Sequence, residues 1–146
     1  MVLVDVNVLV YAWDRRASEH AASIAWLDAH LSGTQRVGLP WESLMGFLRI
    51  VTNPRIYQRP ATVQAAWRQV ESWLEAGPVW IPIPGPAHAA NLAKLMPHLG
   101  GGANLIPDAH LAALAIANGL TLISTDGDFA RFPGLTWVNP LLKNSN

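Results

Sequence analysis

The chain has 146 residues, 51% of them hydrophobic and 14% charged, which is enough apolar material for a folded core and excludes a disordered chain. Ten basic and ten acidic side chains balance to a net charge of zero, and the absence of cysteine excludes disulfides and thiolate metal sites. The sequence has no signal peptide and no apolar run of the ~20 residues that a membrane span needs, so we expect one cytoplasmic domain over residues 1–146, with no membrane association.

Segments typical of strands and of helices alternate along the chain. Short apolar runs predict strands, and apolar residues repeating every three to four positions predict helices. Strands are expected at residues 2–6, 36–39, 79–83, 120–124 and 135–138. Helices are expected at residues 18–31 with Ser18 as N-cap, 41–52, 63–74, 86–96 and 107–118, with a short helix capped by Asp128, a flexible loop at 100–104 and a frayed tail from Lys143. This alternation predicts an α/β fold with a parallel sheet covered on both faces.

Four acidic side chains occur in apolar segments of the sequence, and the predicted fold brings them together. Asp5 lies within an apolar run and Asp126 directly follows one, so both are expected at the carboxyl ends of strands. Glu42 and Asp108 are expected in the first turns of helices. In parallel α/β sheets these strand and helix ends share one edge, where ligands bind. Clustered carboxylates repel one another, and Mg²⁺ or Mn²⁺ prefers their oxygens, so the pattern favours a metal-dependent enzyme.

Each of these side chains also has a purely structural interpretation. Glu42 and Asp108 are favourable charges at helix amino ends, and Asp126 fits a turn. Asp5 is the hardest to explain in this way, because burying an unpaired carboxylate costs several kcal/mol or more. Asn7 and Thr125 are candidates to hydrogen-bond the carboxylates or a metal-bound water, although both are equally suited to capping a helix or a turn.

At these positions the chain resembles the PIN-domain nucleases and, more narrowly, the VapC toxins of VapBC toxin–antitoxin systems. The resemblance spans nearly the whole chain, and it rests on the segments DVNVLVYA at 5–12, DAHLAALA at 108–115 and TDGDF at 125–129, with Glu42 in a helix. It implies a three-layer α/β/α fold with about five parallel strands. It also implies a Mg²⁺- or Mn²⁺-dependent endoribonuclease that forms a homodimer and is inhibited by a VapB antitoxin. Position by position, it implies that the catalytic and metal-binding acids are Asp5, Glu42, Asp108 and Asp126, with Asp128 as an additional metal-binding acid.

An RNA substrate needs cations to contact its phosphates. The loop at residues 53–60 places Arg55 and Arg59 on either side of Tyr57, whose ring is able to stack on an unpaired base, so these residues are candidate RNA contacts. A solvated loop is the competing interpretation. The five histidines show no spacing typical of a metal site, and the helical position of His110 turns it away from Asp108. We therefore expect no chemical role for them.

Two other functions remain open from the sequence. One is a phosphatase with Asp5 as nucleophile. Such an enzyme is expected to have a second aspartate at the position of Asn7, and the chain has no glycine-rich phosphate loop. The other is a binding module whose acids only cap helices. A site for a divalent cation that depends on Asp5 and Asp108 would separate an enzyme from such a module.

Overall fold

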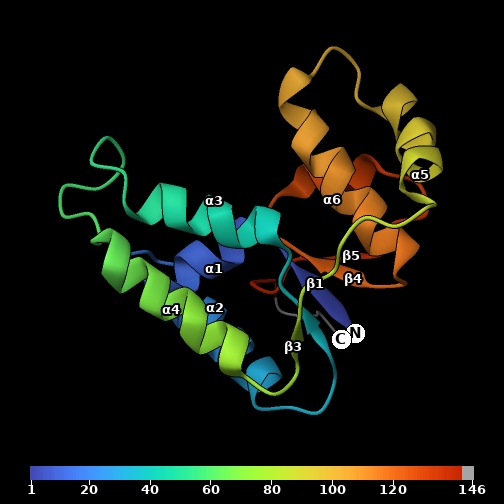
Figure 1. Cartoon of the computed structure of the whole chain (residues 1–146). Coiled ribbons are helices and arrows are strands. Elements are labelled where there is room, and N and C mark those ends of the chain that lie inside the picture. Colours follow the sequence, from blue (N-terminus) through green and yellow to red (C-terminus); the bar gives the residue numbers. More distant parts are fainter. Residues whose placement is uncertain (143–146) are drawn as a thin grey trace.

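A parallel sheet of five short strands forms the centre of the computed structural model, which describes residues 1–142 (Figure 1). The strands are β1 (Val2–Val4), β2 (Val37–Gly38), β3 (Val79–Trp80), β4 (Thr121–Ile123) and β5 (Trp137–Val138), in the order β3-β2-β1-β4-β5. The predicted sheet is therefore confirmed, with every strand shorter than expected. At the end of β3, for example, Pro82 and Pro84 have no N–H to extend the ladder. The tail predicted from Lys143 lies outside the described residues.

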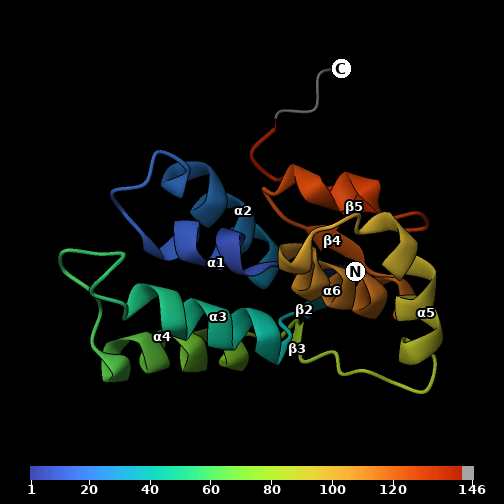
Figure 2. The same ribbon diagram turned by 90° about the horizontal axis from the view of Figure 1, so that it is seen from above.

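Helices cover both faces of this sheet (Figures 1 and 2). One face carries α1 (Val6–Trp13), α2 (His20–Leu31), α3 (Trp41–Val51) and α4 (Val63–Glu75), and the other carries α5 (His88–Leu95) and α6 (Ile106–Ala117). Successive strand residues point to opposite faces, so Val4 belongs to the core under α1 to α4 while Leu3 belongs to the core under α5 and α6. The three-layer α/β/α fold is confirmed.

The helix α1 differs from the sequence prediction, which places a strand over residues 2–6 and no helix before residue 18. Its valines alternate along the sequence as they do in a strand, and β-branched residues are poor helix formers. The helix forms because it is buried between the sheet, α2 and α3, and this packing outweighs local propensity. Asp5 caps the helix: its Oδ1 accepts a hydrogen bond of 2.8 Å from the N–H of Val6.

Three smaller predictions about helix ends and loops are also wrong. The helix α2 begins at His20, and the residue at its N-cap position, Glu19, makes no capping hydrogen bond with its side chain, so Ser18 is not the cap. The short helix near the C-terminus, η3 (Gly127–Arg131), is capped by Asp126, whose side chain accepts from the N–H of Asp128. Part of the predicted flexible loop forms a 3₁₀ turn. That turn is η2 (Ala103–Leu105), which includes the last two residues of the predicted loop, and a second 3₁₀ turn, η1 (Met96–His98), precedes it.

The pairing of β1 with β4 determines which residues meet at the carboxyl edge of the sheet. Val4 pairs with Ile123, and the N–H of Asp5 donates to the carbonyl of Ile123 over 2.9 Å. Asp5 and Ser124 therefore leave the sheet side by side. The first turn of α3 reaches the same edge, because the buried hydroxyl of Ser43 donates to the carbonyl of Val4 over 2.7 Å. Within the described residues, no helix has the length and apolar character needed to cross a membrane.

Candidate active site

Asp5 is a buried carboxylate with hydrogen-bond donors on both oxygens. Only 9% of the residue is exposed, which is rare for an aspartate without a cationic partner. Oδ1 accepts from Val6, and Oδ2 accepts from the hydroxyl of Ser124 at 2.7 Å and from the amide of Asn7 at 3.2 Å. Burial raises the pKa of Asp5 above its ordinary value, and the nearby charge of Asp126 adds to the increase while the hydrogen bonds oppose it. The site thus contains a carboxylate that is fixed in position but costly to keep charged.

Ser124 is the residue of this site that the sequence did not reveal. Its fully buried hydroxyl donates to Asp5 and accepts from the side-chain amide of Asn7 and from the backbone N–H of Asp126, both at 3.0 Å. One hydroxyl therefore links the end of β1, the start of α1 and the turn after β4. The signal that points to Ser124 is its position, since it follows β4 as Asp5 follows the neighbouring strand β1.

Asn7 is placed as predicted, while Thr125 contributes in a different way. The amide nitrogen of Asn7 donates to Asp5 and Ser124, and its oxygen accepts from the backbone N–H of Thr125 at 3.2 Å. Among residues 1–142, the hydroxyl of Thr125 makes no hydrogen bond to a carboxylate, while its predicted contact with a metal-bound water stays a prediction. Asn7 instead orients Asp5 and the turn that carries Asp126.

Three further carboxylates gather beside Asp5. One oxygen from each of Asp108, Asp126 and Asp128 lies within 4.8 Å of the others. Desolvation, followed by the charges of Asp126, Asp5 and Asp128, raises the pKa of Asp108 to about 6, and the cation of Arg131 opposes this increase. These residues come from the first turn of α6, the turn after β4 and η3, as the shared-edge prediction requires.

The exposed end of this cluster has a cation of its own. The guanidinium of Arg131 forms an ion pair with Asp128 at 3.2 Å and donates from Nε to the backbone carbonyl of the same residue at 3.1 Å. Asp5 and Asp108 have no such partner within the described residues. The uncompensated negative charge is therefore concentrated on the buried side of the cluster.

Glu42 is not one of the three carboxylates whose oxygens lie within 4.8 Å of one another, and neither is Asp5, so its predicted place in one four-acid site stays a prediction. It lies in the first turn of α3 as expected, but its Oε1 is 3.0 Å from Nε2 of His110, and its carboxylate is not part of the aspartate group. Although α6 turns His110 away from Asp108 as predicted, it turns this side chain toward Glu42. His110 therefore contacts one of the predicted site acids, and the expectation that the histidines have no chemical role stays a prediction.

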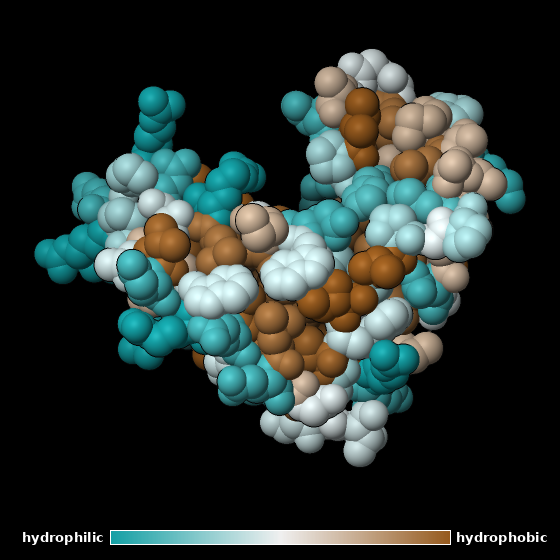
Figure 3. Space-filling view, in the orientation of Figure 1, coloured by the Kyte–Doolittle hydropathy of each residue, from teal (hydrophilic) through white to brown (hydrophobic). Residues whose placement is uncertain are grey.

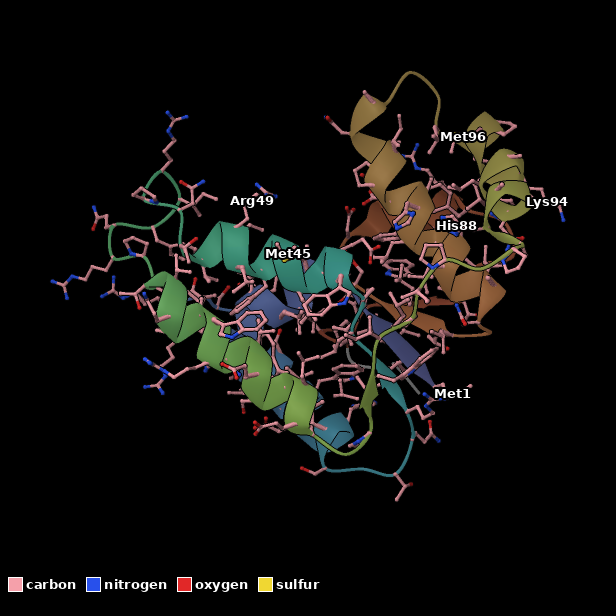
Figure 4. All side chains as sticks on the ribbon, in the orientation of Figure 1. Met1, Met45, Arg49, His88, Lys94 and Met96 are labelled. Atoms are coloured by element: carbon pink, nitrogen blue, oxygen red, sulfur yellow. The ribbon has the colours of Figure 1, made fainter. Side chains whose placement is uncertain are left out.

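His88 extends this contact into a chain of three side chains. It points from the first residue of α5 toward α6 (Figure 4), and its Nε2 is 2.9 Å from Nδ1 of His110. A carboxylate only accepts hydrogen bonds, so Nε2 of His110 donates to Glu42; between neutral imidazoles, Nδ1 of His110 would then accept from Nε2 of His88. Nδ1 of His88 then carries a lone pair that is buried without a partner in the described structure. Burial and the neighbouring His110 lower the pKa of His88 and keep the imidazole neutral.

The donor set fits a hard divalent cation. All of the grouped ligands are carboxylates, which Mg²⁺ and Mn²⁺ prefer, and the raised pKa of Asp108 shows that its charge is poorly compensated by the protein alone. Space is also available. Figure 3 shows a broad hollow with a hydrophilic floor between the part of the molecule that carries α3 and the part that carries α5 and α6. The residues that would hold the ion are Asp108, Asp126 and Asp5, with Asp128 at the exposed side.

The predicted RNA contacts lie away from the carboxylates. Arg55 and Arg59 are exposed in the loop between α3 and α4, beyond the carboxyl end of α3. Tyr57 packs edge-on against Trp13 at the last position of α1, with ring centroids 5.6 Å apart. Asp5 caps the opposite end of that helix. These residues are thus placed to contact a flanking part of a long ligand rather than its reacting group.

Comparison with known proteins gives a consistent result. The sequence pattern of the PIN domain matches residues 2–135. Ribonuclease VapC37 of Mycobacterium tuberculosis is 43% identical over 140 residues, covering 96% of this chain and 97% of the relative. VapC ribonuclease Mb2897 of Mycobacterium bovis is 40% identical over 141 residues, covering 97% of this chain and 96% of that protein.

Solved structures share the fold at much lower sequence identity. The crystal structure of VapBC2 from Rickettsia felis bound to a promoter DNA fragment matches with a TM-score of 0.70 and 17% identity, over 95% of this chain and 98% of that one. FitAcB from Neisseria gonorrhoeae matches with a TM-score of 0.68 and 24% identity, over 96% and 98% of the two chains. These similarities support the three-layer architecture.

Proposed function

This chain belongs to the PIN-domain family, and from that premise we propose that it is a metal-dependent endoribonuclease of the VapC type, the toxin of a toxin–antitoxin pair. The observation that carries the proposal is the meeting of Asp5, Asp108 and Asp126 at one edge of the sheet. They come from three separate elements, yet the charge of Asp126 raises the pKa of both Asp5 and Asp108, and the charge of Asp5 raises that of Asp108. Acids that only cap helices do not need to lie close enough to repel one another.

A Mg²⁺ or Mn²⁺ ion bound by these carboxylates would activate water and neutralise the charge of a phosphodiester. The chain's own contribution is to hold the carboxylates in place. Ser124 and Asn7 fix the orientation of Asp5, and the backbone N–H of Asp128 fixes Asp126. We assign Glu42 to the same site as a group that contacts the substrate or its water from the side, because His110 holds its carboxylate outside the aspartate group.

The phosphatase alternative is disfavoured by the surroundings of Asp5. A nucleophilic carboxylate must present an oxygen to phosphorus. Oδ1 of Asp5 accepts from Val6, Oδ2 accepts from Ser124 and Asn7, and the residue is buried. One lone pair of Oδ1 remains, and a metal ion reaches it in this buried position more easily than a phosphoryl group does.

We propose three partners: an RNA substrate, a VapB-type antitoxin and a second copy of the chain. The names of the solved VapBC and FitAB complexes support the antitoxin. An exposed apolar groove of about 360 Å³ between α3 and α4 offers a surface for it, and Met45, Val63 and Trp67 line this groove with 57%, 67% and 40% of their surface exposed. Figure 4 shows Met45 on the side of α3 that faces the viewer. A cytoplasmic location belongs to the same proposal.

The proposed activity is tested by expressing the protein without its partner and sequencing the new 5′ ends of cellular RNA. We expect wild type to generate cuts at defined sites and Asp108→Asn to generate none. Asp28→Asn, which removes an exposed carboxylate from α2, is the matched control and should cut as wild type does. Equal cleavage by Asp108→Asn and wild type would refute the assignment of the site, and no cleavage by wild type would refute the proposed function.

A further inference from the structure

A second concave site lies at the other end of α1. The cavity measures about 470 Å³ and is formed where the carboxyl end of α1 and the segment leading into α2 meet the loop between α3 and α4. Three arginines line it, Arg15 and Arg16 from the first segment and Arg59 from the loop. Segments more than 40 positions apart in the sequence therefore bring cations to one cavity.

None of these three arginines forms an ion pair with a carboxylate within the described part of the chain. Asp14 is the acid that lines the same cavity, and its Oδ1 accepts from the backbone N–H of Arg16 at 3.1 Å. Burial and then the charge of Asp14 raise the pKa of Tyr57, and this one carboxylate lies beside three guanidinium groups. Guanidinium groups that face a cavity and form no ion pair are suited to phosphate, which they bind through paired N–H donors.

The wall of the cavity also contains two aromatic side chains held in fixed positions. Trp13 packs edge-on against Tyr57 at 5.6 Å and against the fully buried Phe47 at 6.4 Å between ring centroids. Aromatic rings beside cations are the usual means of binding an unpaired nucleotide, because the ring stacks on the base while the cation contacts its phosphate. An acidic peptide would use the cations but would have little use for the rings.

We propose that this cavity binds a nucleotide of the RNA substrate that flanks the cleaved bond, with Arg15, Arg16 and Arg59 on its phosphates and Trp13 and Tyr57 against its base. The inference rests on the proposed ribonuclease function. The eight residues of α1 separate the cavity from Asp5 by about 12 Å. One RNA strand has to span this distance to reach both sites, so the cavity recognises sequence or length at a position away from the cut.

The test is ultraviolet cross-linking of total cellular RNA to the Asp108→Asn protein, followed by mass spectrometry of peptides that carry a nucleotide. We expect cross-links at Tyr57 or Trp13. Arg16→Gln and Arg59→Gln should each lower the cross-linking yield about fivefold and reduce the slope of log affinity against log salt by about 0.7, the single-strand value for one phosphate contact. Lys94→Gln, which removes an exposed charge from α5, is the control and should change neither quantity.

The possible outcomes separate this inference from the proposed function. Cross-links confined to peptides of the acidic edge, with equal yields for the arginine variants and Lys94→Gln, would overturn the cavity assignment and leave the ribonuclease intact. Arginine variants that bind the antitoxin more weakly but cross-link RNA normally would also overturn it, because they would make the cavity a protein contact. Absence of both RNA cross-links and RNA cleavage would overturn the inference together with the proposed function.

Discussion

The two ends of α1 differ in the sign of the nearby charges and in whether those charges are buried or exposed to water. At the amino end, Asp5 is buried beside Asp108 and Asp126, and the charge of Asp126 raises the pKa of both Asp5 and Asp108. At the carboxyl end, Arg15 and Arg16 are exposed to water. Asp5 stands at the helix end where the dipole favours negative charge, but the C-cap of α1 is Asp14 and its last turn contains no basic residue, so the dipole does not account for the difference between the two ends. The net charge of zero therefore arises from a chain with a negative cluster near the amino end of α1 and a positive cluster near its carboxyl end.

Burial explains why only one of these ends is costly. Exposed charges are screened by water and salt, whereas charges withdrawn from water interact strongly with one another. The carboxylates at the amino end therefore repel one another strongly, and a bound cation relieves this repulsion. The exposed arginines at the carboxyl end repel one another only weakly. A substitution or a change of conditions at the carboxylate end should therefore change stability more than one at the arginine end.

The largest effect on stability is expected from Ser124→Ala at the carboxylate end. The change leaves the buried Oδ2 of Asp5 with one weaker donor and leaves the amide of Asn7 without one of its acceptors. Loss of a buried hydrogen-bond partner costs about 1–3 kcal/mol, so the free energy of unfolding in urea should fall by that amount. Ser72→Ala on the exposed surface of α4 is the matched control, and an equal change in both variants would show that Ser124 does not support the site.

The pH dependence of stability should also come from the carboxylate end. The pKa of Asp108 is raised in the folded protein from 3.8 to about 6, so the folded state binds the proton more tightly than the unfolded state does. Without metal, the contribution of Asp108 to thermal stability should therefore rise as the pH is lowered from about 7 toward 4, while His88, whose pKa is lowered in the folded protein, contributes in the opposite direction. Saturating Mn²⁺ should remove or reverse this trend, since the ion favours the charged carboxylates. Melting curves at several pH values, with EDTA or with Mn²⁺, check both directions.

The smallest effect is expected at the arginine end. Exposed substitutions away from buried contacts change stability by about 0.5 kcal/mol or less, so Arg15→Gln and Arg16→Gln should leave the unfolding free energy nearly unchanged. A loss above 1 kcal/mol in urea titrations would mean that these cations stabilise the fold instead of remaining available to a ligand.

The sequence predicts the sheet and the convergence of three aspartates because both follow from general rules. Strands that alternate with helices give a parallel sheet, and the carboxyl ends of its strands meet at one edge. The helix α1 could not be read in this way, since its valines alternate as in a strand and only burial against α2 and α3 makes it helical.

The remaining differences arise from contacts between distant side chains. Ser124 meets Asp5 across 119 positions, and His110 meets Glu42 across 68 positions. Helical periodicity gives the face on which a residue lies, but it does not say which side chain of another element will be within reach. The separation of Glu42 from the aspartates therefore becomes visible only in three dimensions.

Locating Mn²⁺ by anomalous scattering in crystals of this protein tests most directly whether the carboxylates gather to hold a cation. We expect a peak in contact with Asp108 and Asp126, next to Asp5, and no peak there in crystals of Asp108→Asn. Occupied manganese positions elsewhere with none at this edge, or an unchanged peak in the variant, would contradict a metal site built by these aspartates.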